Sequence, residues 1–272
     1  MSSRTRARTG VLTAALLVGA IGVAEGSHAR IIAGAQRESR IEAEKLARTV
    51  ISSKLGPSAV FAARPPYGRV AARSTERLAE FPRSGKQFLI LSNGDALLAD
   101  NKNSAGDSGQ GAGGPVIRGA RDVTIYRINM RVPRGHNCLG FSFRFLTEEF
   151  PEFVSKEFND AFIAEIDQTT WDTNATGNPT IDAPRNFATG ANGRRISVNG
   201  VGATTVTAAN AKGTTYDGAT RVLRARTPIT PGRHRLYLSI FDQGDRQFDS
   251  AVFVDNIRTA KKGSCPSGVV ID

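Results

Sequence analysis

The sequence is short of the residues on which many enzymes and metalloproteins depend. It has two cysteines, three histidines and one tryptophan in 272 residues. There is no Cys-x-x-Cys and no histidine cluster, which argues against a zinc site. No Gly-x-Ser-x-Gly is present, and the Gly-rich stretch at 109–114 is followed by no lysine. Neither a serine-hydrolase elbow nor a phosphate-binding loop is therefore indicated.

Long apolar runs are also missing, with one short exception at the start of the chain. Three arginines in the first eight residues form a basic head, and residues 11–24 are almost wholly apolar or small. Ser27-His28-Ala29 then offers the small residues that a signal peptidase reads. We predict a signal peptide over 1–29, because the run falls short of the roughly 20 residues of a membrane span. An uncleaved anchor or a buried helix is the alternative.

Export affects two expectations: whether the cysteines pair, and what net charge the mature chain carries. Cys138 and Cys265 are expected to pair outside the reducing cytosol, and two unpaired thiols are the alternative. Cleavage after Ala29 removes three arginines and Glu25, which lowers the formal net charge from +11 to +9. The remaining arginines are scattered without a nucleic-acid-binding motif, so no specific nucleic-acid partner is predicted. Such a surface gives solubility, or weak electrostatic affinity for anionic envelope polymers.

One helix followed by many strands is the expected organisation. Residues 39–55 predict a helix with Ile41 and Leu46 on its apolar face, Ser39 as its cap and Gly56-Pro57 at its end. Alternating apolar and polar residues then predict strands at 87–92, 123–132, 138–146, 160–167, 194–206, 233–241 and 251–257. Many short alternating strands indicate a mostly β fold, an antiparallel sandwich of jelly-roll-like type with the helix at its edge.

Turn and loop signals separate these strands. Asn199-Gly200 predicts a hairpin within 194–206. Residues 101–115 are rich in Gly, Ser and Asn and predict a surface loop or a lid. We divide the chain into a signal peptide (1–29), a short linker (30–38), one domain (39–262) and a C-terminal tail (263–272).

Two acidic stretches stand out in this basic protein. The first, FRFLTEEFPEFVSKEFNDAF at 143–162, combines six phenylalanines with five carboxylates. The second, FDQGDRQFDSAVFV at 241–254, contains three aspartates between two strands. The phenylalanines of the first strand should point inward, so the acids begin where the strand ends. If the two loops lie at one edge of the sandwich, their carboxylates converge.

These two stretches carry a resemblance. EEFPEFV with FNDAF, followed some 80 residues later by FDQGDRQFDSAVFVDN, is similar to the choice-of-anchor L domain of bacterial surface proteins. The resemblance covers roughly 40–258. It implies an exported β-rich module of a surface or adhesion protein, secreted or held at the cell surface. The end of this chain, KKGSCPSGVVID, has no LPxTG-like motif, which favours release or non-covalent retention.

Calcium is the cofactor that the acids predict, because Ca²⁺ takes about 6–8 oxygen ligands. The candidate ligands come from both stretches: Glu148, Glu149, Asn159, Asp160, Asp242, Asp245 and Asp249. The alternative is that these residues serve turns and caps or pair with arginines. The spacing matches no EF-hand loop.

A non-catalytic binding or adhesion module is thus the predicted function, with an unidentified envelope glycan or protein as partner. The runner-up is a carbohydrate-active hydrolase that uses paired carboxylates from these loops. Trp171, the single tryptophan, lies in the polar stretch DQTTWDTNATGNPT. It could contact a ligand at the surface by stacking on a sugar, or it could plug one end of the core.

Overall fold

The computed structural model describes residues 31–33, 40–66, 69–103, 111–174 and 180–272. These residues form an antiparallel β-sandwich with a helix packed at its edge, as the alternating pattern predicts. The predicted signal peptide and part of the predicted Gly-rich loop lie outside the described residues. Within the described ranges, no helix is both long and apolar enough to cross a bilayer.

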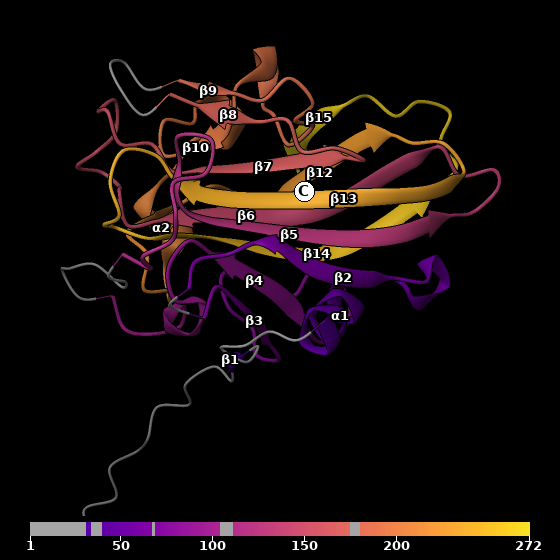
Figure 1. The fold of residues 1–272 in the computed structure, drawn as a ribbon, viewed down its shortest axis with the longest axis horizontal. Helices are drawn as coiled ribbons and strands as arrows, with labels where there is room; N and C mark the ends of the chain where they lie inside the picture. Colours follow the sequence, from indigo (N-terminus) through magenta and orange to yellow (C-terminus); the bar gives the residue numbers. More distant parts are fainter. Residues whose placement is uncertain (1–30, 34–39, 67–68, 104–110, 175–179) are drawn as a thin grey trace, which may run out of the picture.

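Two sheets face each other across the core (Figure 1). The larger has eight strands in the order β1 (Ile31–Ala33), β3 (Ala71–Ser74), β4 (Phe88–Ser92), β14 (Ser250–Ala260), β6 (Cys138–Thr147), β12 (Leu223–Pro228) and β15 (Gly268–Ile271), with β11 (Gly218–Ala219) also on β6. The smaller has five, in the order β10 (Ile196–Ser197), β7 (Ala161–Ile166), β13 (Gly232–Asp242), β5 (Arg121–Val132) and β2 (Ser58–Ala63). A separate ribbon joins β8 (Asp172–Thr173) to β9 (Ile181–Asp182).

The chain crosses repeatedly from one sheet to the other. It passes from β5 to β6 to β7, and later from β12 to β13 to β14, changing sheets at each step. Such crossings are those of a jelly-roll-like sandwich. Because β6 pairs with β14 and β7 pairs with β13, the β6–β7 and β13–β14 loops lie together at one end of the sandwich.

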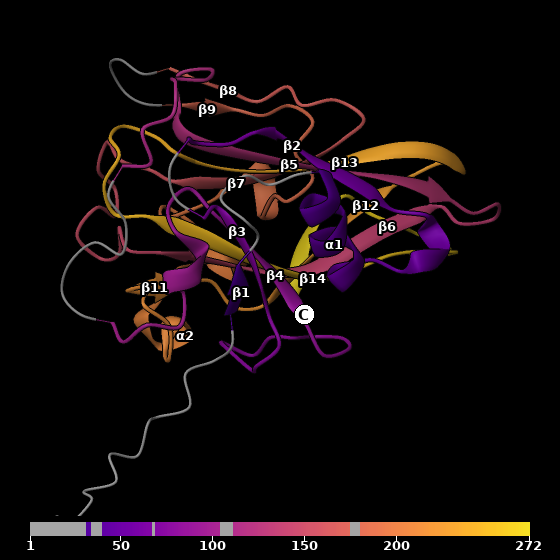
Figure 2. The same ribbon diagram turned by 60° about the horizontal axis from the view of Figure 1, so that its bottom comes forward.

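A helix closes one edge of the core. α1 (Arg40–Val50) packs between β2 and β4 (Figure 2), and its buried residues are Ala43, Leu46, Ala47 and Val50. The predicted helix was too long: Ile51 bridges to Ile257 instead, and a 3₁₀ turn, η1 (Ser53–Leu55), follows. Ile41, predicted on the apolar face, is 65% exposed, because small alanines occupy the face that meets the sheets.

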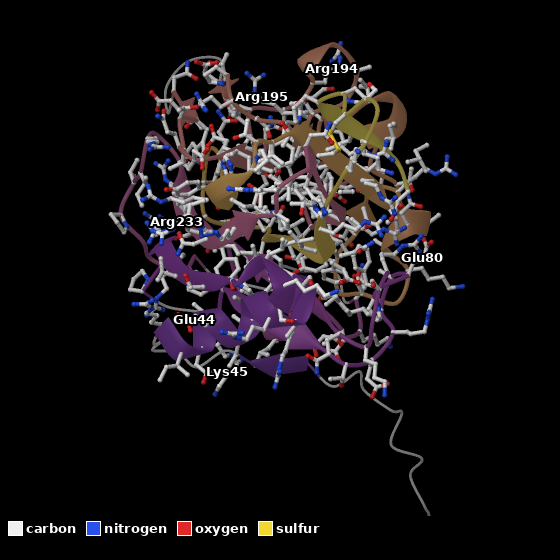
Figure 3. The ribbon with its side chains drawn as sticks, turned by 90° about the vertical axis from the view of Figure 1, so that its right-hand side faces the viewer. Glu44, Lys45, Glu80, Arg194, Arg195 and Arg233 are labelled. Carbon is white, nitrogen blue, oxygen red and sulfur yellow. A yellow bond between two sulfur atoms is a disulfide. The ribbon has the colours of Figure 1, made fainter. Side chains whose placement is uncertain are left out.

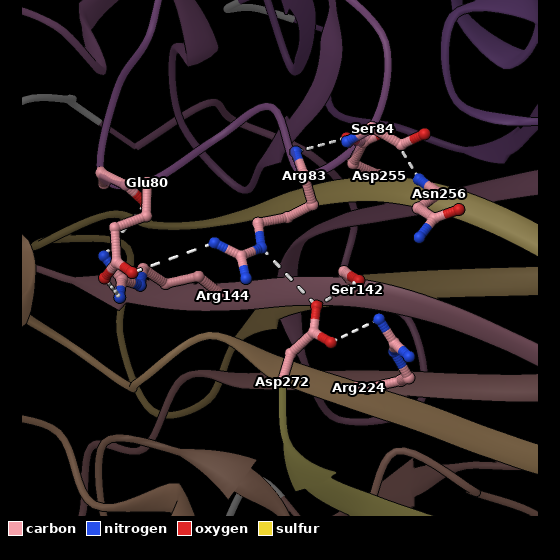
Figure 4. Close-up of polar contacts among 10 residues, drawn as sticks. Glu80, Arg83, Ser84, Ser142, Arg144, Arg224, Asp255, Asn256 and Asp272 are labelled. Atoms are coloured by element: carbon pink, nitrogen blue, oxygen red, sulfur yellow. Dashed lines mark hydrogen bonds and ion pairs between the residues drawn. The ribbon is translucent and has the colours of Figure 1, made fainter.

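Both sheets are also covered on parts of their outer faces, which the predicted alternation did not anticipate. Three further short elements are η2 (Ala96–Leu98), η3 (Ala191–Gly193) and η4 (Gly202–Thr204), and α2 is a single turn (Ala208–Ala211). Arg144 lies on the outward phase of β6, yet it is only 2% exposed. It donates to the carbonyls of Ala79 and Asn210 and to Glu80 (Figure 4).

The structure differs from one predicted turn, and two short strands lie beyond the bounds of the predicted domain. No second strand follows Asn199-Gly200, because the two-residue β10 pairs with β7 and leads into η4. The predicted linker contains β1, which pairs with β3. The predicted tail contributes β15, and Asp272 beyond it forms ion pairs with Arg83 and Arg224 (Figure 4). Strand pairing between distant segments decides these features.

A disulfide joins Cys138 to Cys265, with the two Cα atoms 5.6 Å apart. Cys138 begins β6, whereas the β6–β7 loop follows its other end. The bond therefore lies at the opposite end of the sandwich from the two acidic loops; Figure 3 draws it in yellow. It holds the segment that leads into β15 against the start of β6.

Candidate functional site

The two acidic loops meet at one end of the sandwich, which we call the acidic end. It comprises Glu148, Glu149, Asp160, Asp242, Asp245 and Asp249. Each of the two sheets ends there in a pair of acids that face each other across neighbouring strands. The prediction that the two stretches converge at one edge is therefore confirmed.

The smaller sheet supplies the first pair. Phe241 of β13 is paired with Ala161 of β7, and the same register places Asp242 opposite Asp160. The pairing continues into the loops, where the Asn159 backbone N–H donates to the Gln243 carbonyl at 3.1 Å. Asp242 is 1% exposed and Asp160 is 0% exposed. Like charges directly opposite each other destabilise a strand pair, so this arrangement costs stability.

The larger sheet supplies the second pair. Thr147 of β6 is paired with Ser250 of β14, and the next N–H, that of Glu148, donates to the Asp249 carbonyl at 3.1 Å. Both acids are buried. Gly94 lies against Asp249, because a Cβ on Gly94 would be 1.8 Å from the Asp249 Oδ2 atom. The Asp249 carboxylate can therefore lie this close to the backbone only because residue 94 is glycine.

Asn93 and Glu149 connect the two sheets at the acidic end. The Asn93 amide donates to Asp160 Oδ2 at 2.7 Å, and its oxygen accepts from the Ser250 N–H at 2.7 Å. Glu149 Oε2 accepts from the Asp160 N–H at 3.0 Å. Sequence analysis did not single out Asn93. Its position directly after a fully buried strand was the available signal.

Burial dominates the electrostatics of the acidic end. It raises the pKa of Glu149 to about 8, an effect opposed by the hydrogen bond from the Asp160 N–H and increased by the charge of Asp245. Burial also raises the pKa of Asp160 and of Asp242 well above their ordinary values, and the neighbouring carboxylates raise both further. In the described part of the chain, no Lys or Arg forms an ion pair with these three acids. At neutral pH they must therefore hold protons or a cation.

Among the described residues, four buried oxygens at this end accept no hydrogen bond. They are Asp160 Oδ1, both carboxylate oxygens of Asp242, and Gln243 Oε1. A buried acceptor without a partner is costly, and carboxylate and amide oxygens are ligands that Ca²⁺ prefers. Across the described ranges, however, no three His, Cys, Asp or Glu side chains are grouped so that they alone could hold a metal ion.

The other predicted ligands have separate surroundings. The Asn159 side chain accepts from the Asn199 amide at 3.2 Å, in the direction of the neighbouring loop. Asp245 is half-buried and accepts from the Gln247 N–H at 3.0 Å. Glu148 and Asp249 adjoin Tyr216, whose pKa is raised well above its ordinary value by burial first and then by their charges. Sequence analysis did not predict this position for Tyr216.

Residues 70–257 match the family model of the choice-of-anchor L domain. This chain belongs to the choice-of-anchor L family. The match spans both acidic loops and nearly all of the strands, and it begins after α1 and β2. The acidic end is therefore part of the choice-of-anchor L domain itself.

Two solved structures resemble the domain only distantly. One is a carbohydrate-binding module in complex with β-1,4-galactotriose, with 9% identity, a TM-score of 0.30, and coverage of 79% of this chain and 99% of that one. The other is the K2 cleaved adhesin domain of Lys-gingipain, with 11% identity, a TM-score of 0.32, and coverage of 85% and 97%. No curated protein matches in sequence. TM-scores at this level carry no argument about function.

Of the two alternatives for Trp171 of this choice-of-anchor L domain, contact with a ligand at the surface or burial in a core, the structure shows burial. Trp171 is 0% exposed. Its ring stacks on Phe241 with the centroids 4.2 Å apart, and the guanidinium carbon of Arg118 lies 5.3 Å from its centroid. The polar residues around it in sequence concealed a large apolar area that packs over the outer face of the smaller sheet.

Proposed function

We propose that this protein is an exported, non-catalytic binding module of the surface or adhesion type, with a calcium ion at its acidic end. Family membership supports the surface role, because the resemblance implies exported β-rich modules. The disulfide supports it independently, since such bonds persist outside the reducing cytosol. An envelope glycan or protein is the proposed partner.

The observation that carries the calcium proposal is the set of buried oxygens without partners at Asp160, Asp242 and Gln243. These residues would hold the ion, with Glu149 nearby and backbone carbonyls completing the 6–8 oxygens that Ca²⁺ requires. Bound calcium would supply the positive charge that this end lacks. Asp160 and Asp242 contribute carboxylate oxygens to this set, and the amide oxygen of Gln243 is an essential third part of the proposed ligand set.

Calcium is expected to stabilise the mature chain, residues 30–272. At a calcium concentration about 100-fold above the dissociation constant, the gain is about 2.7 kcal/mol, which corresponds to roughly 5–10 °C in the unfolding midpoint. The measurement is thermal unfolding at pH 7.5 in millimolar CaCl₂ and in EGTA.

The control variants separate this site from general ionic effects. Asp242→Asn should lose the calcium response, whereas Asp182→Asn, at an exposed aspartate of β9, should keep it. An equal midpoint with and without calcium in the unmodified chain would remove the ion from the proposal and leave the binding role standing.

Binding itself is testable without knowing the partner. We expect the purified mature chain to sediment with isolated bacterial cell-envelope material and to remain in solution without it. Enzymatic removal of glycan in one sample and of protein in another should abolish the binding in only one of the two. The treatment that abolishes it identifies the class of partner. A chain that stays in solution with every envelope preparation would contradict the binding role.

A glycoside hydrolase is the second candidate, and the raised pKa of Glu149 is the observation that favours it. A general acid must hold its proton near neutral pH, and burial raises the pKa of Glu149 to about 8. However, Glu149 is 1% exposed and Asp160 is 0% exposed, so a sugar ring cannot reach either carboxyl group. Hydrolysis of a glycan that is lost in Glu149→Gln would overturn the non-catalytic assignment.

A further inference from the structure

A groove lies on the outer face of the smaller sheet, at the end opposite to the acidic end. Its volume is about 790 Å³. We call it the arginine groove, and its lining residues include Arg127, Arg131, Arg233, Arg235, Asn129 and Ser58. Arg127, Asn129 and Arg131 alternate along β5, and Arg233 and Arg235 alternate along the start of β13, so their side chains share one face of the sheet.

The groove concentrates positive charge. The strand register places Arg131 directly opposite Arg233 and Asn129 opposite Arg235, and opposed like charges destabilise a strand pair. In the part of the chain that the structure describes, none of the four guanidinium groups forms an ion pair with a carboxylate. Arg131, Arg233 and Arg235 are exposed, and Arg127 is half-buried with an Nε–H that donates to no described residue.

Among the described residues, one carboxylate lines the groove, and it already accepts hydrogen bonds. Asp167 pairs through Oδ2 with His234 Nδ1 at 2.9 Å, and its Oδ1 accepts from the Arg235 backbone N–H at 3.0 Å. Asp167 therefore fixes the start of β13 and leaves the four guanidinium groups available to a ligand. Figure 3 shows Arg233 at the left of the molecule, apart from Arg194 and Arg195 at the top.

The uncharged lining indicates what kind of anion fits. Asn129 donates to the Ser58 hydroxyl at 2.9 Å, and both present polar groups suited to sugar hydroxyls. No Phe, Tyr or Trp is among the described residues that line the groove, so it lacks the large aromatic rings on which successive bases or the apolar faces of neutral sugars stack. Guanidinium groups bind carboxylate and sulfate oxygens in bidentate fashion.

We propose that the arginine groove binds an anionic polysaccharide, with its guanidinium groups paired to carboxylate or sulfate groups along the sugar chain. This inference rests on the proposed binding role and locates the surface that performs it. It is separate from the acidic end, since Arg233 and Asp242 lie near opposite ends of β13.

The test measures binding of three polymers by the mature chain: polygalacturonate, dextran sulfate and uncharged dextran. We expect the first two, or one of them, to bind with an affinity that falls as salt rises, and uncharged dextran not to bind. Their relative affinities distinguish carboxylate from sulfate as the group recognised. The double variant Arg131→Gln, Arg233→Gln should bind about tenfold more weakly or worse, since charge-assisted hydrogen bonds are lost.

A matched variant controls for net charge. Arg194→Gln, Arg221→Gln removes two exposed arginines elsewhere and should keep the affinity of the unmodified chain. The groove variant should unfold at an unchanged or higher temperature, because it removes two arginines that repel each other. The control variant should likewise unfold no lower than the unmodified chain. Equal losses in the two variants, or a single-stranded DNA oligonucleotide bound as tightly through the same arginines, would overturn the proposal.

The outcomes also separate this inference from the proposed function. If the mature chain binds envelope material and the groove variant binds it equally well, the groove is not the binding surface but the binding role stands. If the mature chain binds no envelope material at all, both fail together. Loss of envelope binding in the groove variant alone supports both.

Discussion

Removal of the disulfide between Cys138 and Cys265 is expected to lower the free energy of unfolding by about 4–5 kcal/mol. The bond links residues 127 positions apart in sequence, and closing so long a loop restricts the unfolded chain strongly. For a domain of this size the loss corresponds to a fall of roughly 10–15 °C in the unfolding midpoint. It would also free the segment that carries β15 from the start of β6.

The experiment compares the mature chain with the double variant Cys138→Ser, Cys265→Ser by thermal and urea unfolding. A reductant should lower the midpoint of the unmodified chain towards that of the variant and should leave the variant unchanged. If the two proteins unfold at the same temperature under oxidising conditions, the bond contributes nothing and the expectation is wrong. Calcium binding should survive in the variant, because the acidic end lies at the other end of β6.

The second large effect is the pH dependence of the metal-free protein. The folded-state pKa of Glu149 is raised from 4.5 to about 8, and those of Asp160 and Asp242 are raised as well. Between pH 4.5 and about 8 the folded state therefore binds more protons than the unfolded state. The free energy of unfolding is consequently greatest at low pH and falls as pH rises. We expect a loss of at least about 2 kcal/mol between pH 5 and pH 8.5 in EGTA.

Asp242→Asn tests whether the buried acids cause this loss of stability with rising pH. Asparagine carries no charge, so the metal-free variant should be more stable than the unmodified chain at pH 8.5 and closely similar to it at pH 5. Asp182→Asn, at an exposed position, should follow the unmodified chain throughout. Calcium should reverse the trend, because it binds ionised carboxylates and competes with protons. A metal-free protein whose stability rises with pH over this range would contradict the buried acidic pairs.

The strands were predictable because their signal is local. Phe141, Phe143 and Phe145 alternate along one segment, and all three are buried in the core as that period requires. The predicted position of the acids was also local information, since Glu148 and Asp242 lie where strands end. The helix boundary and the hairpin at Asn199-Gly200 were mispredicted, and the choice between a surface and a buried position for Trp171 stayed open, because each depends on what packs against it from elsewhere in the chain.

The sequence by itself determined a β-rich chain of the choice-of-anchor L family, with acids grouped at the ends of its strands. Periodicity, turn residues and motif order are properties of neighbouring residues, so they are legible without coordinates. Only the tertiary structure decided that Asp160 opposes Asp242, that Asn93 joins the two sheets, and that Arg131 opposes Arg233 across an open groove. Register between strands that are distant in sequence is set by packing of the whole core, and a one-residue slip would send each of these side chains to the other face.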